Sequence, residues 1–365
     1  MVTDRTAEVV LPCAELNETL SFFTDRLGFC VESVFPADDP SVVVIAAYGL
    51  RLRLERGASG APGAIRLSSR DPAAVAGGVL TLVAPNGTRV EIVESEPPLA
   101  VPELVPSLVV SRASEATWSV GRAGMRYRDL IAGRQGGCFI ASHIRIAEGG
   151  PVPDYVHFHQ VRFQMIYCVA GWVRVVYEDQ GEPFELREGD CVLQPPRIRH
   201  RVLESSPGLE VIELSCPAAH TTFADPDLAL PTATCNPDRV FGGQRFVRHE
   251  AASANWTLSD GGFESRDTGV SLATGGLASA MVHRGGGALG SGSGQDSAHD
   301  ADLLFRYVLA GHVTLHCAAE PHGGSWQLSQ GDSCVVPRGQ VHSLRGGSAN
   351  LEFLEVSVND SASRA

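Results

Sequence analysis

An internal repeat constrains the fold of this chain more than any other feature of its sequence. Gly171 matches Gly311 at an offset of 140 residues, and His200 matches His342 at an offset of 142. A drift of a few residues between such landmarks is what loop insertions produce in a duplicated domain. The sequence therefore predicts two similar units in tandem.

Short apolar runs separated by turn-forming residues dominate both repeats. The chain has 39 glycines and 22 prolines among its 365 residues. Runs of Val, Ile and Leu end at Gly, Pro or Asp after roughly 8 to 12 residues, the spacing of strands in sandwiches and barrels. Hydrophobic residues make up 44% of the chain, enough for a sizeable core. We therefore expect a folded, mostly β protein.

The first part of the chain has a different pattern, in which a helix follows a strand. An apolar run at 9–12 precedes apolar residues at helical spacing over 16–27, and Gly28 ends the helix. Three alternating strands follow, at 29–35, 41–47 and 50–55. A hairpin around Asn86-Gly87 comes next. The predicted order is βαβββ followed by a shortened second set.

Composition and spacing divide the chain into five parts. Four prolines between Pro97 and Pro106 indicate a stiff, extended linker. The expected parts are a small α+β module at 1–96, a linker at 97–107, the first repeat at 108–220, a connector at 221–259 and the second repeat at 260–358.

The charged residues exclude several classes of function. All 29 basic residues are arginine, and the absence of lysine removes Schiff-base chemistry, pyridoxal phosphate attachment and the Walker lysine. The 42 acidic residues give a net charge of −13, which repels phosphate backbones and anionic membranes. We therefore expect neither a nucleic-acid partner nor membrane association.

The cysteines and the N-terminus indicate the cellular compartment. Nine cysteines are scattered without a C-x-x-C pair, which is typical of reduced thiols that pack in a core. No basic stretch followed by an apolar one begins the chain, and no apolar run approaches the roughly 18 residues of a membrane span. We expect a cytoplasmic protein.

The residues with the strongest chemical signal lie in the first repeat. His157 and His159 are two apart in a strand-like run at 155–163, so both imidazoles project to one face. Gln164 follows them, and His200 comes after a Gly-x5-Pro-x4 segment. Three neutral imidazoles suit Fe, Mn, Ni, Cu or Zn and leave coordination positions open for a substrate.

The spacings H-x-H-x4-Q-x6-G and G-x5-P-x4-H resemble the two motifs of the cupin superfamily. The match covers roughly 108–218 and, in part, 260–358. The resemblance implies a bicupin, with two tandem double-stranded β-helix (jelly-roll) barrels. It also implies that His157, His159, Gln164 and His200 hold one divalent metal per chain, with Fe(II) as our first choice.

Gln164 is a departure from the family pattern, which has glutamate at this position. A carboxamide oxygen can ligate a metal but brings no negative charge, so a divalent ion keeps its full +2 charge and favours an anionic chelating substrate. Gln164 also cannot act as a general base, which disfavours isomerases that use that carboxylate. Arg162 and Tyr155 are the candidate substrate-binding residues. Three nearby arginines either attract an anion or are solvated surface charge: Arg197, Arg199 and Arg201.

Other reactive residues near these motifs are expected to be structural. Ile140, Ile144 and Ile146 share one face of a strand, which leaves His143 on the opposite, polar face and outside the ligand set. Cysteines near the site, Cys168 and Cys191, have no activating partner in the sequence and are expected to pack in the core.

The second repeat keeps the scaffold but loses the ligands. At an offset of 140, His157 falls on Ser297, His159 on His299 and Gln164 on Leu304. His342 keeps the place of the last histidine. Ser297, His299, Leu304 and His342 therefore form a degenerate site, since two histidines with Ser and Leu bind a metal poorly.

The first part of the chain resembles the glyoxalase-like, vicinal-oxygen-chelate modules. The likeness rests on residues 11–16, 27–29 and 84–92. The resemblance maps the metal positions of that family to Glu8 and Glu91, but this part of the chain contains no histidine. We expect a truncated module that is retained for packing or dimerisation.

These features predict a metal-dependent cupin oxygenase, most simply a mononuclear iron dioxygenase that acts on a small, possibly anionic, chelating acid such as an aromatic or enol-forming one. Substrate and dioxygen would occupy the open positions on the metal. Two alternatives stay open: a non-redox isomerase or epimerase, and a sensor or storage protein that binds a small molecule without turnover. We also expect a homodimer, because open sheet edges need to be covered.

Overall fold

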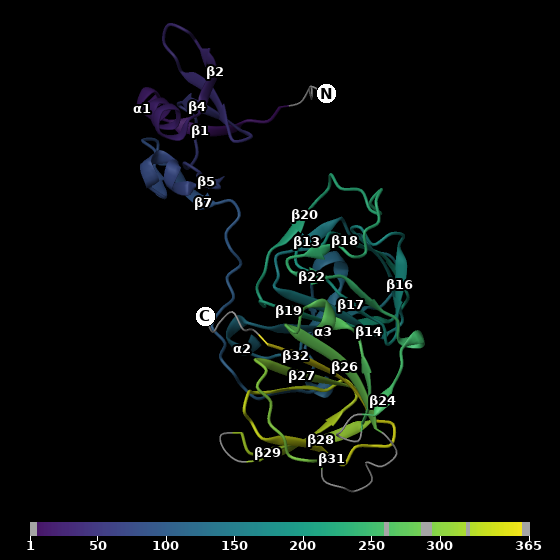
Figure 1. Cartoon of the computed structure of the whole chain (residues 1–365). Helices are drawn as coiled ribbons and strands as arrows, with labels where there is room; N and C mark the ends of the chain where they lie inside the picture. Colours follow the sequence, from purple (N-terminus) through teal and green to yellow (C-terminus); the bar gives the residue numbers. More distant parts are fainter. Residues whose placement is uncertain (1–5, 259–262, 286–293, 319–321, 360–365) are drawn as a thin grey trace. The chain divides into compact units, whose positions relative to one another are not determined.

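The computed structural model describes residues 6–258, 263–285, 294–318 and 322–359. The chain divides into two compact units, Met1–Pro98 and Leu99–Ala365, and each is described by itself (Figure 1). Strands dominate both units, as predicted. Within the described ranges, no helix is long and apolar enough to span a membrane.

The N-terminal unit begins with the predicted βαβββ order. Its elements are β1 (Val9–Cys13), α1 (Leu16–Ser21), the π-helical turn η1 (Phe22–Arg26), β2 (Cys30–Phe35), β3 (Val42–Ala47) and β4 (Leu50–Arg56). The strands form a sheet in the order β1-β4-β3-β2, with β1 parallel to β4. The predicted helix at 16–27 is therefore a short α-helix that continues as a wider turn.

A second sheet completes this unit with the order β5-β7-β6. Its strands are β5 (Ala64–Ser69), β6 (Thr81–Val83) and β7 (Arg89–Glu94), and the short turns η2 (Pro72–Ala74) and η3 (Ala76–Gly78) lie between β5 and β6. We did not predict β5, although Ile65 to Ser68 alternate between apolar and polar residues, and only Leu67 of this strand is buried. One apolar core joins the two sheets and includes Leu11, Phe23, Ile45, Leu54, Val90 and Ile92.

The unit from Leu99 onward contains two β-sandwiches, which we call the first and the second sandwich. The large sheet of the first sandwich has the order β23-β17-β14-β19-β11-β10-β9. Its strands are β9 (Ser119–Val120), β10 (Arg126–Asp129), β11 (Ile140–Ile146), β14 (Phe163–Ala170), β17 (Cys191–Leu193), β19 (Leu209–Cys216) and β23 (Val247–His249). The small sheet has the order β16-β15-β18-β13-β20, and β12 also pairs with β18. Its strands are β12 (Gly150–Pro151), β13 (His157–His159), β15 (Trp172–Tyr177), β16 (Phe184–Arg187), β18 (His200–Ser205) and β20 (Thr222–Ala224).

The second sandwich repeats this arrangement. Its large sheet has the order β24-β25-β26-β32-β27-β30-β8, and its small sheet has the order β29-β28-β31. The large-sheet strands are β8 (Val109–Ser111), β24 (Thr257–Leu258), β25 (Phe263–Asp267), β26 (Ala278–Gly285), β27 (Leu303–Ala310), β30 (Ser333–Val336) and β32 (Glu352–Val358). The small-sheet strands are β28 (His312–Cys317), β29 (Gly324–Ser329) and β31 (His342–Arg345).

Short elements connect these strands. They are α2 (Arg134–Gly137), α3 (Val270–Ala273), η4 (Ala113–Glu115), η5 (Arg122–Gly124), η6 (Ala251–Ser253) and the two-stranded pair β21 (Val240–Phe241) and β22 (Gln244–Arg245).

The two sandwiches exchange edge strands. β8 comes before the first sandwich in sequence but pairs with β30 of the second, where Val110 lies opposite Cys334. β23 comes before the second sandwich but pairs with β17 of the first, where Arg248 lies opposite Val192. β8 lies in the part expected to form the first repeat (108–220), and β23 lies in the expected connector (221–259), so the sheets do not follow these boundaries.

One apolar core joins the large sheets of the two sandwiches. On β14, Phe163, Met165 and Tyr167 belong to this shared core, and Phe305 and Tyr307 of β27 belong to it as well. Successive side chains of a strand point to opposite faces. The residues between them, such as Gln164 and Ile166, therefore face the interior of their own sandwich, where separate apolar clusters fill much of the space.

One detail of the predicted fold needs correction. The run at 155–163 is not one strand, because β13 ends at His159 and β14 begins at Phe163 in a different sheet. The two predicted β units are each present as a pair of sheets, and among the described residues the strand pairing does not run on from one sheet into the other as a closed ring.

We expect Phe305→Ala to lower the free energy of unfolding by about 3–5 kcal/mol, because Phe305 is fully buried in the shared core and its truncation leaves a cavity there. Urea denaturation followed by circular dichroism measures this change. Leu272→Ala is the control, since Leu272 is 92% exposed and should change stability by less than about 0.5 kcal/mol. A small change for Phe305→Ala would contradict the shared core.

Candidate metal centre

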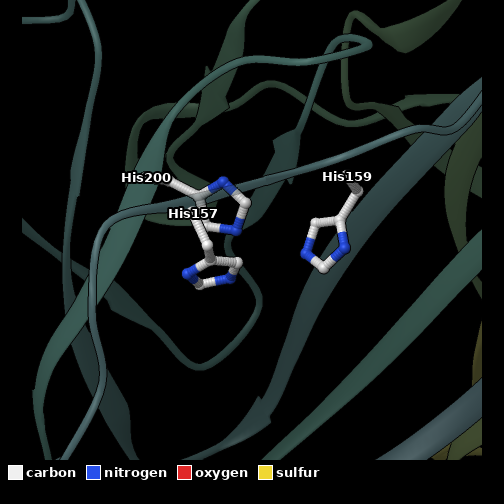
Figure 2. A group of neighbouring side chains, drawn as sticks. All are labelled: His157, His159 and His200. Carbon is white, nitrogen blue, oxygen red and sulfur yellow. The ribbon is translucent and has the colours of Figure 1, made fainter. Parts of the chain in front are cut away.

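Three histidines of the first sandwich meet across two neighbouring strands. His157 and His159 lie on β13, and His200 begins β18, where it is paired with His157. One nitrogen atom from each imidazole lies within 4.8 Å of the other two. Figure 2 shows His157 and His200 close together with His159 beside them, in keeping with ring-centroid distances of 4.2 Å and 5.2 Å. Among the described residues, this is the only group of His, Cys, Asp or Glu side chains with metal-site geometry.

Hydrogen bonds to the Nδ1 atoms orient the three rings. The Nδ1 atom of His157 donates to the Tyr155 carbonyl oxygen at 2.7 Å, and that of His200 donates to the Ile198 carbonyl oxygen at 3.1 Å. The Nδ1 atom of His159 lies 2.9 Å from the hydroxyl oxygen of Thr222. An engaged Nδ1 leaves Nε2 as the ligand atom of each ring.

Burial keeps these imidazoles in the form that binds metals. It lowers the pKa of His157 and of His200, and it lowers the pKa of His159 to about 3 with the neighbouring His157 as the next cause. Only the neutral imidazole has a free lone pair for a metal ion. The three rings are therefore uncharged donors at neutral pH.

Gln164 adds a fourth donor of the kind that a metal site uses. It lies on β14, is 1% exposed, and its Nε2 atom has no hydrogen-bond partner among the described residues. An amide nitrogen donates hydrogen bonds and cannot bind a cation, so Gln164 would offer its Oε1 atom to a metal. A divalent transition metal fits this donor set of three neutral nitrogens and an amide oxygen.

A cavity of about 300 Å³ lies beside the histidines inside the first sandwich. Its walls are mostly aliphatic, and the polar residues that line it are Arg122, Tyr127, His159, Tyr177, Gln194, His200, Glu213, His220 and Thr222. A small apolar cavity with a few convergent polar groups is typical of a small-molecule site.

Glu213 and His220 are two of the polar cavity residues that were not predicted from the sequence, and both can exchange a proton. Glu213 lies on β19 beside Gln164, and burial raises its pKa, although His220 and Gln164 act in the opposite direction. The Nδ1 atom of His220 donates to the Pro217 carbonyl oxygen at 2.9 Å, and its ring lies 5.4 Å from that of His159. A lone glutamate within the apolar run 211–214 was the available signal.

Arg122 is the basic residue of this cavity, and the sequence analysis missed it too. Its Nη2 atom lies 3.1 Å from Nε2 of His157, and its Nη1 atom forms an ion pair with the buried Asp154. Asp154 also accepts a hydrogen bond from the backbone of Val202 at 2.9 Å. Arg122 thus occupies the His157 nitrogen that would bind a metal, and it must move for His157 to become a ligand.

The candidate substrate-binding residues lie outside the cavity lining. Tyr155 is 47% exposed and packs edge-on against His157. Arg162 lines a separate hollow with Pro196 and Gln244. The guanidinium groups of two further candidates stack on the Phe158 ring, at 5.4 Å for Arg197 and 4.4 Å for Arg199, and Arg201 is exposed.

In the second sandwich, a backbone bridge joins Ser297 to His342, as His157 pairs with His200 in the first. Nε2 of His299 is bound to the Val336 carbonyl oxygen at 3.0 Å, and Leu304 is buried in an apolar cluster.

The other reactive residues have structural contacts. His143 is buried, not on a polar face as predicted, and its Nε2 atom lies 2.7 Å from the carboxylate of Glu210. None of the nine cysteines, all of which lie in the described ranges, forms a disulfide, and burial raises the pKa of Cys168 and Cys191 to about 12. In the N-terminal unit, Glu8 pairs with Arg51 and Glu91 with Arg89.

Comparison with known proteins bears on the fold. The family model described as the cupin domain matches residues 142–212 and 288–357, so the chain carries two cupin domains. A point mutant of oxalate decarboxylase from Bacillus subtilis is similar with a TM-score of 0.52 and 13% identity, over 72% of this chain and 78% of that chain. A structure of the same Bacillus subtilis enzyme, described with Mn(II) centres, has the same TM-score, identity and coverage. No curated protein sequence matches the chain. At this identity, the likeness shows the fold alone.

We expect His159→Ala to abolish stoichiometric metal binding, because it removes one of three Nε2 donors. Elemental analysis of the purified protein, with and without reconstitution, measures the metal content. The matched control is His299→Ala in the second sandwich, which should leave the metal content unchanged. Equal metal content in His159→Ala and wild type would contradict this site.

We expect Arg122→Gln to tighten metal binding by roughly tenfold, because it removes a positive charge beside Nε2 of His157. Chelator competition measures the dissociation constant, and Arg126→Gln, at an exposed position on the same segment, is the control. A weaker affinity in Arg122→Gln would show that Arg122 supports the site instead of competing with the metal.

Proposed function

We propose that this chain, with its two cupin domains, is a metal-dependent enzyme that acts on a small organic acid, and that it is an oxygenase. The observation that carries the proposal is the convergence of three neutral imidazoles beside a cavity, with one nitrogen atom of each ring within 4.8 Å of the other two. His157, His159 and His200, with the Gln164 amide oxygen, would hold the metal. Bound Fe(II) would supply Lewis acidity and one-electron redox chemistry to substrate and dioxygen.

The cavity supports a small substrate with an anionic group. Its volume of about 300 Å³ is at the lower end for ligand pockets, and its aliphatic walls would exclude water from the substrate. Arg122 is the cavity's basic side chain and can form a bidentate contact with a carboxylate. We propose that the substrate carboxylate draws Arg122 away from His157, which couples substrate binding to completion of the ligand set.

A non-redox reaction is the second candidate, and the position of Glu213 favours it. Gln164 cannot exchange a proton, but Glu213 and His220 line the same cavity and can do so. The presence of Gln164 in place of glutamate therefore no longer disfavours an isomerase. Manganese is the first alternative to iron, since the similar Bacillus subtilis oxalate decarboxylase is described with Mn(II) centres.

We propose that the N-terminal unit is a glyoxalase-like module without a metal site. Its βαβββ order and its parallel β1–β4 and β5–β7 pairs support the likeness. Its candidate acids, Glu8 and Glu91, are each paired with an arginine. We propose that this unit serves packing or homodimerisation.

Oxygen consumption tests the proposed reaction. We expect the Fe(II)-reconstituted protein to consume dioxygen when a small aromatic, hydroxy or keto acid is added, and His159→Ala to consume none. An oxygen electrode measures the rate, and His299→Ala is the control. Conversion of an acid without oxygen uptake would favour the isomerase. A ligand that raises the melting temperature but is not consumed would favour a binding protein.

A further inference from the structure

The two cupin domains place a glutamate at the same point of their interiors. On β19 of the first sandwich, Glu213 lies opposite Ile166 of β14. On β32 of the second sandwich, Glu355 lies opposite Arg306 of β27. Both strand pairs have a register shift just beyond this point, so the two positions correspond. In both cases the side chain faces away from the shared core and into its own sandwich.

In the second sandwich, an arginine neutralises this glutamate. The Nε atom of Arg306 donates to the Glu355 carboxylate at 2.6 Å, and His283 lies 3.7 Å from the same carboxylate. The pair occupies the interior of the domain whose ligand positions are Ser297 and Leu304. In the second domain, which lacks the metal ligands, the Arg306 guanidinium is thus the cation beside this glutamate.

In the first sandwich, Ile166 replaces that arginine. Among the residues that the structure describes, no arginine forms an ion pair with Glu213, and the guanidinium of Arg122 is paired with Asp154. The polar groups beside Glu213 are the His220 ring and the Gln164 amide. A carboxylate inside a protein without a cationic partner is costly. The first domain therefore keeps this glutamate without the arginine that balances its charge in the second domain.

A metal ion bound at the three histidines would carry an excess of positive charge. Three neutral imidazoles and a neutral amide leave a divalent ion with its full +2 charge. Glu213 lines the same cavity as His159 and His200 and lies beside Gln164. Its oxygen atoms do not join the cluster of imidazole nitrogens within 4.8 Å, so it is not a fourth member of that group.

We propose that Glu213 is the charge-balancing carboxylate of the metal centre in the first domain, and that it takes over the charge that Gln164 lacks. Glu213 is a positioning residue, which acts on the metal through Gln164 and from the cavity wall. The second domain has lost the metal and replaced it with the Arg306 guanidinium. This inference rests on the metal site of the proposed function and adds to it a residue outside the two cupin motifs.

Titration of the full-length apo protein with Co(II) tests this proposal, with visible absorption and chelator competition as readouts. We expect Glu213→Gln to weaken Co(II) affinity about 10- to 100-fold, as is usual when a partner of a metal ligand is lost. Adding Gln164→Glu to this variant restores the negative charge one strand away and should recover most of the affinity. The gain from Gln164→Glu should be larger in the Glu213→Gln background than in the wild type, and an equal gain in both would indicate a purely structural role for Glu213.

Two further variants complete the test. Ile166→Arg builds the ion pair of the second domain into the first and should abolish Co(II) binding with an unchanged circular dichroism spectrum. Glu355→Gln is the matched control in the second domain and should leave the affinity unchanged. If Glu213→Gln does not fold, Ile166→Arg decides the question by itself.

The outcomes separate this inference from the proposed function. Wild-type affinity in Glu213→Gln or in Ile166→Arg would overturn the role of Glu213 and leave the histidine site intact. Equal losses in Glu213→Gln and Glu355→Gln would overturn it as well, because the effect would not be specific to the first domain. If the wild type binds no Co(II), the proposed function fails, and this inference fails with it.

Discussion

The packing of the two large sheets against each other is the constraint on which the rest of this structure depends. Phe163 and Tyr167 from the first sandwich share a core with Phe305 and Leu354 from the second. Because these side chains point into the shared core, the residues next to them on each strand point to the opposite face, into the interior of their own sandwich. The phase of β14 and β19 therefore turns Gln164 toward the interior of the first sandwich and places Glu213 in the cavity wall. The exchange of β8 and β23 between the sandwiches holds the same two sheets together at their edges.

The two cupin domains have corresponding interiors, which differ in the groups that bind or supply a positive charge. The first copy keeps three imidazoles whose Nδ1 atoms are engaged by neighbouring oxygens. The second has Ser297 and Leu304 at two of the ligand positions and an Arg306–Glu355 ion pair nearby. A charged pair inside a domain rarely adds much stability, but it satisfies a carboxylate that would otherwise be unpaired. Under the proposed function, this difference gives one scaffold a metal site in the first domain and none in the second.

The sequence predicted those parts of the site that depend on local periodicity. His157 and His159 share a face because they are two apart on a strand, and His200 is paired with His157 across the sheet. Glu213 could not be assigned in this way, because its importance depends on the register between β14 and β19. Arg122 lies in the short turn η5, far from the motif, and a turn's position in space is not encoded in hydrophobic periodicity. The pairing of β8 with the second sandwich was not predicted either, because the sequence of a strand does not determine which strand it pairs with.

The most direct test of the account is an anomalous difference map from crystals of the protein grown with Mn(II). The account predicts one strong peak per chain, within bonding distance of Nε2 of His157, His159 and His200 and with the Arg122 side chain moved away. It predicts no peak between His299 and His342. A map without a peak at the three histidines, or with equal peaks in both domains, would contradict it.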